Sequence, residues 1–141
     1  MIQIQQKNNI IILRYSQLDQ MNRDLDPISD PVDGTIVGRT GHNFPIECIP
    51  SGHWLKSRVK DDVLYVIAYC GSDTLTLNHE LLHARYHLDL EYRRQIQRQW
   101  EELSDKRKSY ICRLLGQMGY KPSVWIDEWQ AYHFSEHLFG Y

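Results

Sequence analysis

The pentapeptide His79-Glu80-Leu81-Leu82-His83 combines two metal-binding side chains with a carboxylate at helical spacing. Residues four apart on an α-helix lie one above the other on the same face, so both imidazole rings can reach one metal ion. A catalytic zinc is held by three protein ligands and keeps a fourth position open. Glu80 follows the first histidine, where a carboxylate can accept a proton from a water that the metal activates. The pattern therefore predicts a hydrolytic zinc site with His79 and His83 as ligands and Glu80 as general base.

The third zinc ligand must come from another part of the sequence. Glu128 is the expected one, because a carboxylate on a largely apolar helix face needs a partner and zinc would supply it. Asp127 beside it, Asp89 or a further histidine are the alternatives. Asp89 lies ten residues after the first histidine, but Tyr86 stands where a glycine would have to end the helix and turn the chain back. His87 lies about 12 Å along the helix axis from the first histidine, too far for the same metal.

Two further residues near Glu128 are candidates for a catalytic role. Zinc peptidases stabilise the oxyanion of the reaction with a second electrophile beside the metal. Tyr132 and His133 follow Glu128 on the same predicted helix and are the first candidates for this electrophile, with Tyr69 and Tyr86 behind them. A metal-bound histidine also needs an acceptor for its other ring N–H, and Asp127 is the candidate for that role.

The N-terminal part of the sequence is predicted to form the strands of the fold that holds these groups. Strand-like patterns are found at residues 2–6, 10–14, 34–37 and 56–70. A short helix is predicted from Ser16 to Leu25. The segment from Asp26 to Gly52 contains four of the five prolines and four glycines, so it is predicted to be mostly loop.

From Asp73 onward the sequence pattern becomes helical. Helices are predicted at residues 73–90, 91–103, 104–118 and 123–139, with Ser72 or Asp73 as the cap of the first. Strands followed by helices indicate an α+β protein. We expect one domain over residues 1–141, with a small antiparallel or mixed N-terminal sheet and a helical half that carries the metal-binding pentapeptide.

Composition excludes several classes of partner. Sixteen basic and eighteen acidic residues give a net charge of −2, which does not favour nucleic acid, and the basic residues near position 100 alternate with acidic ones. The apolar runs are too short to cross a membrane. The N-terminus lacks the pattern of a signal peptide. Three widely spaced cysteines, Cys48, Cys70 and Cys112, indicate free thiols, so we expect a cytoplasmic protein.

The pentapeptide, followed 45 residues later by Glu128-Trp129-Gln130-Ala131, resembles the gluzincin branch of the zincin metallopeptidases. The likeness is greatest to the minigluzincins and the ImmA/IrrE-type regulator proteases, and it covers less than a third of the chain. It implies a zincin-like fold with Zn²⁺ held by His79, His83 and Glu128. It also implies that Glu80 is base and proton shuttle in hydrolysis of a protein or peptide substrate. The strand at residues 63–69 would then lie near the sheet edge that pairs with the substrate.

Other interpretations of the same residues remain open. One is a DNA-associated zinc protease of the SprT type, although those proteins commonly add a basic or zinc-ribbon module that this sequence lacks. Another is a zincin-fold module that binds or regulates a partner protein without catalysis. A third is a structural protein in which the pentapeptide arose by chance. Metal analysis and a protease assay with and without a chelator distinguish these possibilities.

Overall fold

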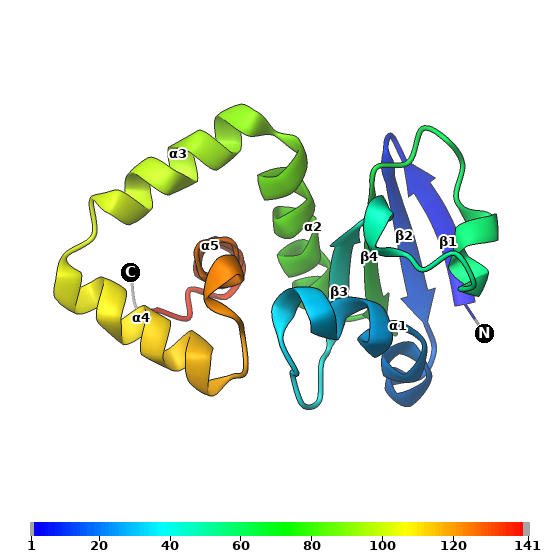
Figure 1. Ribbon diagram of the computed structural model, residues 1–141, viewed down its shortest axis with the longest axis horizontal. Coiled ribbons are helices and arrows are strands. Elements are labelled where there is room, and N and C mark those ends of the chain that lie inside the picture. Colours follow the sequence, from blue (N-terminus) through cyan, green and yellow to red (C-terminus); the bar gives the residue numbers. More distant parts are fainter. Residues whose placement is uncertain (1, 140–141) are drawn as a thin grey trace.

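A four-stranded sheet forms one half of the molecule and a group of helices forms the other (Figure 1). The computed structural model describes residues 2–139. The sheet has the order β1-β2-β4-β3, in which β1–β2 and β3–β4 are antiparallel and β2–β4 is parallel. The strands are β1 (Ile2–Lys7), β2 (Ile10–Tyr15), β3 (Gly41–Pro45) and β4 (Tyr65–Cys70). With five α-helices beside this mixed sheet, the predicted α+β class is confirmed.

Helix α1 (Leu18–Asp33) follows β2 and is longer than the sequence predicted. We expected a helix only to Leu25 and a loop after it, and this was wrong because Pro27 and Pro31 lie inside the helix. Each proline removes one helical hydrogen bond. Burial of an apolar stripe along the helix offsets this loss. The stripe packs under the sheet and consists of Met21, Leu25 and Ile28.

Two predicted strand regions also differ in the structure. Residues 34–36 have no regular secondary structure and a turn follows at residues 37–38, so the predicted short strand is absent; Gly34 has φ +110° and lies against Gly119. Trp54–Arg58 is a 3₁₀ helix, so only Tyr65–Cys70 of the region 56–70 is a strand. That strand, β4, lies between β2 and β3. Residues 63–69 were expected near the sheet edge, and β4 is indeed not the edge itself: β3, its neighbour, is the edge strand on that side.

Helix α2 (Thr74–Leu88) lies between the sheet and the helices that follow it in the chain (Figure 1). Asp73 caps it by accepting a hydrogen bond from the Thr76 amide at 3.0 Å. Helices α3 (Leu90–Glu101), α4 (Asp105–Gln117) and α5 (Trp125–Glu136) follow, with a 3₁₀ turn at Pro122–Val124 before α5. Figure 1 shows α3 and α4 on either side of α5, which packs against α2. The four predicted C-terminal helices are thus confirmed, with shorter bounds.

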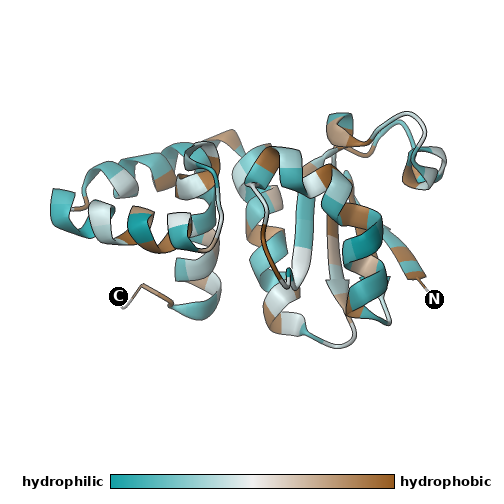
Figure 2. Ribbon diagram, turned by 60° about the horizontal axis from the view of Figure 1, so that its bottom comes forward, coloured by the Kyte–Doolittle hydropathy of each residue, from teal (hydrophilic) through white to brown (hydrophobic). Residues whose placement is uncertain are grey.

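The apolar interior is divided into three cores. One lies between α1 and the sheet, with Leu13, Phe44 and Val66 among its residues. A second lies between the sheet and α2 and includes Ile67 and Ala84, and a third joins α3, α4 and α5 around Trp100 and Trp129. Along the helices, short hydrophobic stretches alternate with hydrophilic ones (Figure 2). No helix within residues 2–139 is long and apolar enough to span a bilayer. The polar groups of α2 and α5 meet where these two helices pack together.

Candidate metal centre

Two imidazole rings and one carboxylate converge between α2 and α5. The Nε2 atoms of His79 and His83 are 3.2 Å apart. Glu128 places Oε1 3.6 Å from Nε2 of His79 and Oε2 3.2 Å from Nε2 of His83. All three side chains are buried. The two rings lie close together because their residues are one helical turn apart on α2. The packing of α5 on α2 brings the Glu128 carboxylate to them.

The far nitrogen of each ring is held by a hydrogen bond. Nδ1 of His83 donates to Asp127 Oδ1 at 2.9 Å, the acceptor role expected for this aspartate. Nδ1 of His79 donates to Ser135 Oγ at 3.3 Å. Ser135 itself donates to the Ala131 carbonyl at 2.6 Å, which leaves its lone pairs for the ring. Both rings therefore direct the lone pair of Nε2 toward the same point, the arrangement of histidines that bind a metal.

The electrostatics of this point favour a cation. Two Nε2 lone pairs that face each other at 3.2 Å repel unless a proton or a metal ion lies between them. Burial opposes protonation of His83, but Asp127 and Glu128 raise its pKa well above the usual value. Burial likewise opposes ionisation of Glu128, yet the two histidines lower its pKa to about 2. Oε1 of Glu128 is buried without a hydrogen bond. A metal ion would satisfy all of these groups together.

Glu80 lies beside the two histidines and is hydrogen-bonded to β3. His79, Glu80 and His83 form a buried group whose possible ligand atoms lie within 4.8 Å of one another, so they could hold a metal ion. Oε2 of Glu80, however, accepts a hydrogen bond from Asn43 Nδ2 at 3.0 Å on β3. The two oxygens of Glu128 instead face the two Nε2 atoms, and they leave Glu80 available for another role.

A cleft of about 260 Å³ leads from the surface to this group. The turn that precedes β3 forms one wall, and Met118, Tyr120, Tyr132 and Glu136 belong to the opposite one. Tyr132 packs its ring against His79, with 4.4 Å between ring centroids, and its hydroxyl lies 3.1 Å from that of Tyr120. Tyr132 is thus placed where the sequence predicted an electrophile. Tyr120 was not predicted, because no motif marks it in the connection between α4 and α5.

Three of the candidate residues lie elsewhere. The ring of His133 stacks on Trp129, with a centroid distance of 5.7 Å, and it is not among the residues that line the cleft. The structure therefore does not bring His133 to the site. Asp89 caps α3 by accepting a hydrogen bond from the Tyr92 amide at 3.1 Å. His87 packs against the ring of Tyr65 at 4.9 Å. His133 points away from the cleft because it is adjacent to Tyr132 on α5, and adjacent residues on a helix face different sides.

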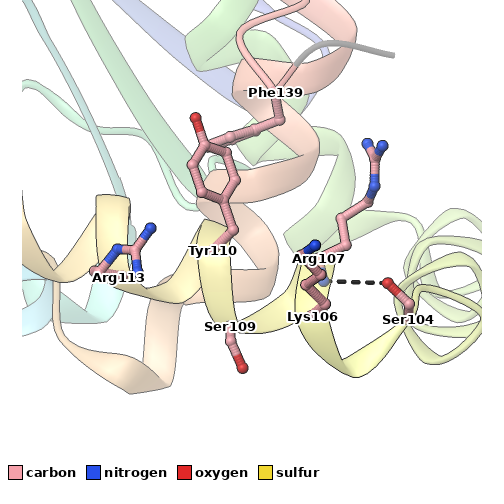
Figure 3. A pocket seen from close by; sticks show the side chains of 7 residues that line it. All are labelled: Ser104, Lys106, Arg107, Ser109, Tyr110, Arg113 and Phe139. Atoms are coloured by element: carbon pink, nitrogen blue, oxygen red, sulfur yellow. Dashed lines mark hydrogen bonds between the residues drawn. The ribbon is translucent and has the colours of Figure 1, made fainter.

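A larger hollow of about 590 Å³ lies on α4, where Figure 3 shows the lining side chains. Its lining offers basic, hydroxyl and aromatic groups: Ser104, Lys106, Arg107, Ser109, Tyr110, Arg113 and Phe139. None of these is a histidine, cysteine, aspartate or glutamate, the side chains that bind zinc. The smaller cleft is therefore the better candidate for a catalytic site.

Comparisons of the chain with models of protein families, with curated proteins and with solved structures found no match. What the site does must therefore be inferred from its own residues. The convergence of His79, His83 and Glu128, with Glu80 beside them, is the arrangement to be explained.

Proposed function

We propose that this chain is a zinc-dependent metallopeptidase of the zincin type, which hydrolyses peptide bonds in a protein or peptide substrate. His79, His83 and Glu128 are the zinc ligands of this proposal, and Glu80 is the general base. The observation that carries it is the convergence of two Nε2 atoms, 3.2 Å apart, with the Glu128 carboxylate, whose oxygens lie 3.6 Å from Nε2 of His79 and 3.2 Å from Nε2 of His83. Hydrogen bonds to Nδ1 of both rings support the same assignment.

The donor set favours zinc in a catalytic site. Two imidazoles and one carboxylate are borderline ligands that suit Zn²⁺, and three protein ligands leave one position for substrate or water. The same donor set also binds Fe(II) in oxygenases. Glu80, a carboxylate that lines the cleft beside the ligands, favours hydrolysis, because hydrolysis needs a general base at this place.

The residues around the site have separate roles in the proposed reaction. The metal, when bound, would supply Lewis-acid polarisation of the scissile carbonyl and acidify water. Glu80 accepts the proton of the attacking water and passes it to the departing amine. Burial raises the pKa of Glu80, which brings its proton affinity closer to what a base near neutral pH requires.

The Tyr120–Tyr132 pair supplies the second electrophile of the proposal. When two hydroxyls share one hydrogen bond, only one of their two protons is used within the pair. The other proton can be donated to the substrate oxygen, where negative charge develops. Burial raises the pKa of Tyr132 to about 12, so its hydroxyl stays protonated at neutral pH.

The substrate of this proposal is an extended peptide along β3. This strand lies at the edge of the sheet, and Gly41 at its start lines the cleft together with His79 and Glu80. An edge strand presents unpaired backbone groups to which a peptide can add as a further strand. A peptide added alongside β3 would then have one of its peptide bonds beside Glu80, the general base.

Metal analysis of protein purified without a histidine tag tests the ligand set. Wild-type protein should carry about one zinc per chain, and Glu128→Ala should lose most of it because one of three ligands is gone. Unchanged zinc in this variant would contradict Glu128 as ligand, and iron in place of zinc would contradict the choice of metal. Arg98→Ala, on the surface of α3, is a control that should keep its metal.

Cleavage of a proteome-derived peptide library, read by mass spectrometry, tests the activity. Wild-type protein should produce cleavage that a chelator abolishes and added zinc restores. Glu80→Gln should keep the zinc and lose at least a hundredfold in rate, because the amide cannot act as base. Metal-replete protein without cleavage would refute the peptidase and support the alternative of a binding module.

A further inference from the structure

Three buried side chains from three different elements form a chain of hydrogen bonds that ends on Glu80. The hydroxyl of Tyr65, on β4, donates to Asn43 Oδ1 at 2.5 Å. Nδ2 of Asn43, on β3, donates to Glu80 Oε2 at 3.0 Å on α2. All three residues are buried, so water does not compete freely for these groups.

The chain of hydrogen bonds has a direction that its chemistry sets. An amide oxygen can only accept, so Tyr65 must be the donor to Oδ1 of Asn43. Burial raises the pKa of Tyr65 well above its usual value, which keeps this donor protonated. With its oxygen engaged, Asn43 presents its NH₂ group to Glu80. A flipped amide would turn its oxygen toward the carboxylate and repel it, so Tyr65 decides which end of Asn43 meets Glu80.

Gly41 restrains the same carboxylate from another side. Residues two apart on a strand share a face, so Gly41 and Asn43 both face Glu80. A Cβ at position 41 would lie 2.8 Å from Oε1 and 2.9 Å from Cγ of Glu80. The side chain of Glu80 therefore occupies the space that any other residue at position 41 would fill. One oxygen rests against the strand and the other is held by the amide.

We propose that Tyr65 and Asn43 are positioning residues that hold Glu80 in the orientation of a general base. The inference rests on the proposed function and adds to it. A glutamate has three rotatable bonds, and a base must stay within hydrogen-bond reach of the proton that it removes. The Tyr65–Asn43–Glu80 chain selects one orientation before substrate binds. Tyr65 acts through Asn43 and Asn43 acts through Glu80, so their loss should slow the reaction without weakening substrate binding.

Kinetics of the best-cleaved peptide from the library give the first readout. Tyr65→Phe should lower kcat about tenfold and leave KM within about twofold, because Asn43 can then rotate. Asn43→Asp keeps the shape but replaces the NH₂ donor by a charged oxygen, so kcat should fall about a hundredfold. Tyr15→Phe is the matched control, since it removes the hydroxyl of another buried tyrosine, bonded to Asp24 at 3.1 Å. Its kcat and KM should equal those of the wild type.

Urea unfolding of chelator-treated protein gives a second readout that needs no activity. In the Glu80→Gln background a flipped Asn43 no longer faces a negative charge. Tyr65→Phe should therefore raise the unfolding equilibrium constant by a factor that is about fivefold smaller in that background than in the wild type. The effects of Tyr15→Phe and Glu80→Gln should combine additively.

The two readouts separate the positioning role from the proposed function. Additive effects of Tyr65→Phe and Glu80→Gln on unfolding, or an unchanged kcat in Tyr65→Phe, would overturn the positioning role. Absence of chelator-sensitive cleavage by the wild type would instead overturn the peptidase. In that case the unfolding measurement still decides whether Tyr65 restrains Glu80 through Asn43.

Discussion

Replacing Gly41 by alanine is a sharp test of how β3 and α2 fit together. The new Cβ would lie 2.7 Å from Thr76 Cγ2 and 2.8 Å from Glu80 Oε1, closer than van der Waals contact allows. Gly41 does not have a positive φ, so backbone strain does not contribute and space alone decides the outcome. Overpacking of this kind costs about 1–3 kcal/mol. We expect the melting temperature to fall by about 3–10 °C in a chain of this length.

The same substitution should affect catalysis more than metal binding. The carboxylate of Glu80 must move away from β3, whereas His79, His83 and Glu128 keep their contacts. Cleavage should therefore fall at least tenfold while the zinc content stays at the wild-type level. Thermal unfolding, metal analysis and the peptide-library assay measure the three effects separately.

Two further variants make this test specific. Gly52→Ala is the control, because a Cβ there meets no atom within 4 Å, and it should leave all three measurements unchanged. Thr76→Ser removes Cγ2 and keeps the hydroxyl that bonds to Asp73. Combined with Gly41→Ala it should restore part of the stability and none of the activity, because the contact with Glu80 remains. A Gly41→Ala protein with wild-type stability and cleavage would refute this account of the packing.

Three further predictions concern other parts of the structure. Asp127→Ala removes the acceptor of the His83 ring and should weaken zinc binding about 10–100-fold in a competition with a chelator; equal affinity would contradict its role. Burial, aided by a neighbouring arginine, lowers the pKa of His42 to about 3, so the folded protein keeps this ring neutral while the unfolded chain protonates it near pH 6.5. Stability should therefore fall as the pH falls from 6.5 toward 3, and between pH 7.5 and 5 the wild type should lose about 2 kcal/mol more than His42→Gln in urea unfolding. Gly34→Ala combines φ +110° with a Cβ 2.1 Å from the Gly119 carbonyl oxygen, so it should open this junction and increase proteolysis near residue 34, whereas unchanged digestion would show that the junction adapts.

Local rules predicted the helical half well because its signals lie close together in the sequence. Asp73 caps α2 through its own side chain, and Ser104 caps α4 by accepting a hydrogen bond from the Arg107 amide. The same local rules failed at α1, where Pro27 and Pro31 indicated a loop. Burial of α1 against the sheet stabilises the helix in spite of its prolines. Such burial depends on contacts with distant residues, which local helix propensity does not take into account.

The spacing of His79 and His83 alone determined that two rings face one point, because every α-helix places residues four apart on one side. Which residue joins them was open between Glu128, Asp127, Asp89 and a further histidine. The packing of α5 on α2 places Asp127 at Nδ1 and Glu128 at the two Nε2 atoms, whereas Asp89 caps another helix.

The surroundings of Glu80 were decided by tertiary structure only. Gly41, Asn43 and Tyr65 come from two strands and Tyr120 from a connection between helices, and no fixed spacing links them to the pentapeptide. A sequence motif records contacts made within one helix, where geometry is the same in every protein. Contacts between elements depend on how β3, β4 and α2 pack. No pattern in the sequence indicates that Gly41, Asn43 and Tyr65 lie close to Glu80, because that proximity arises only when the elements pack together.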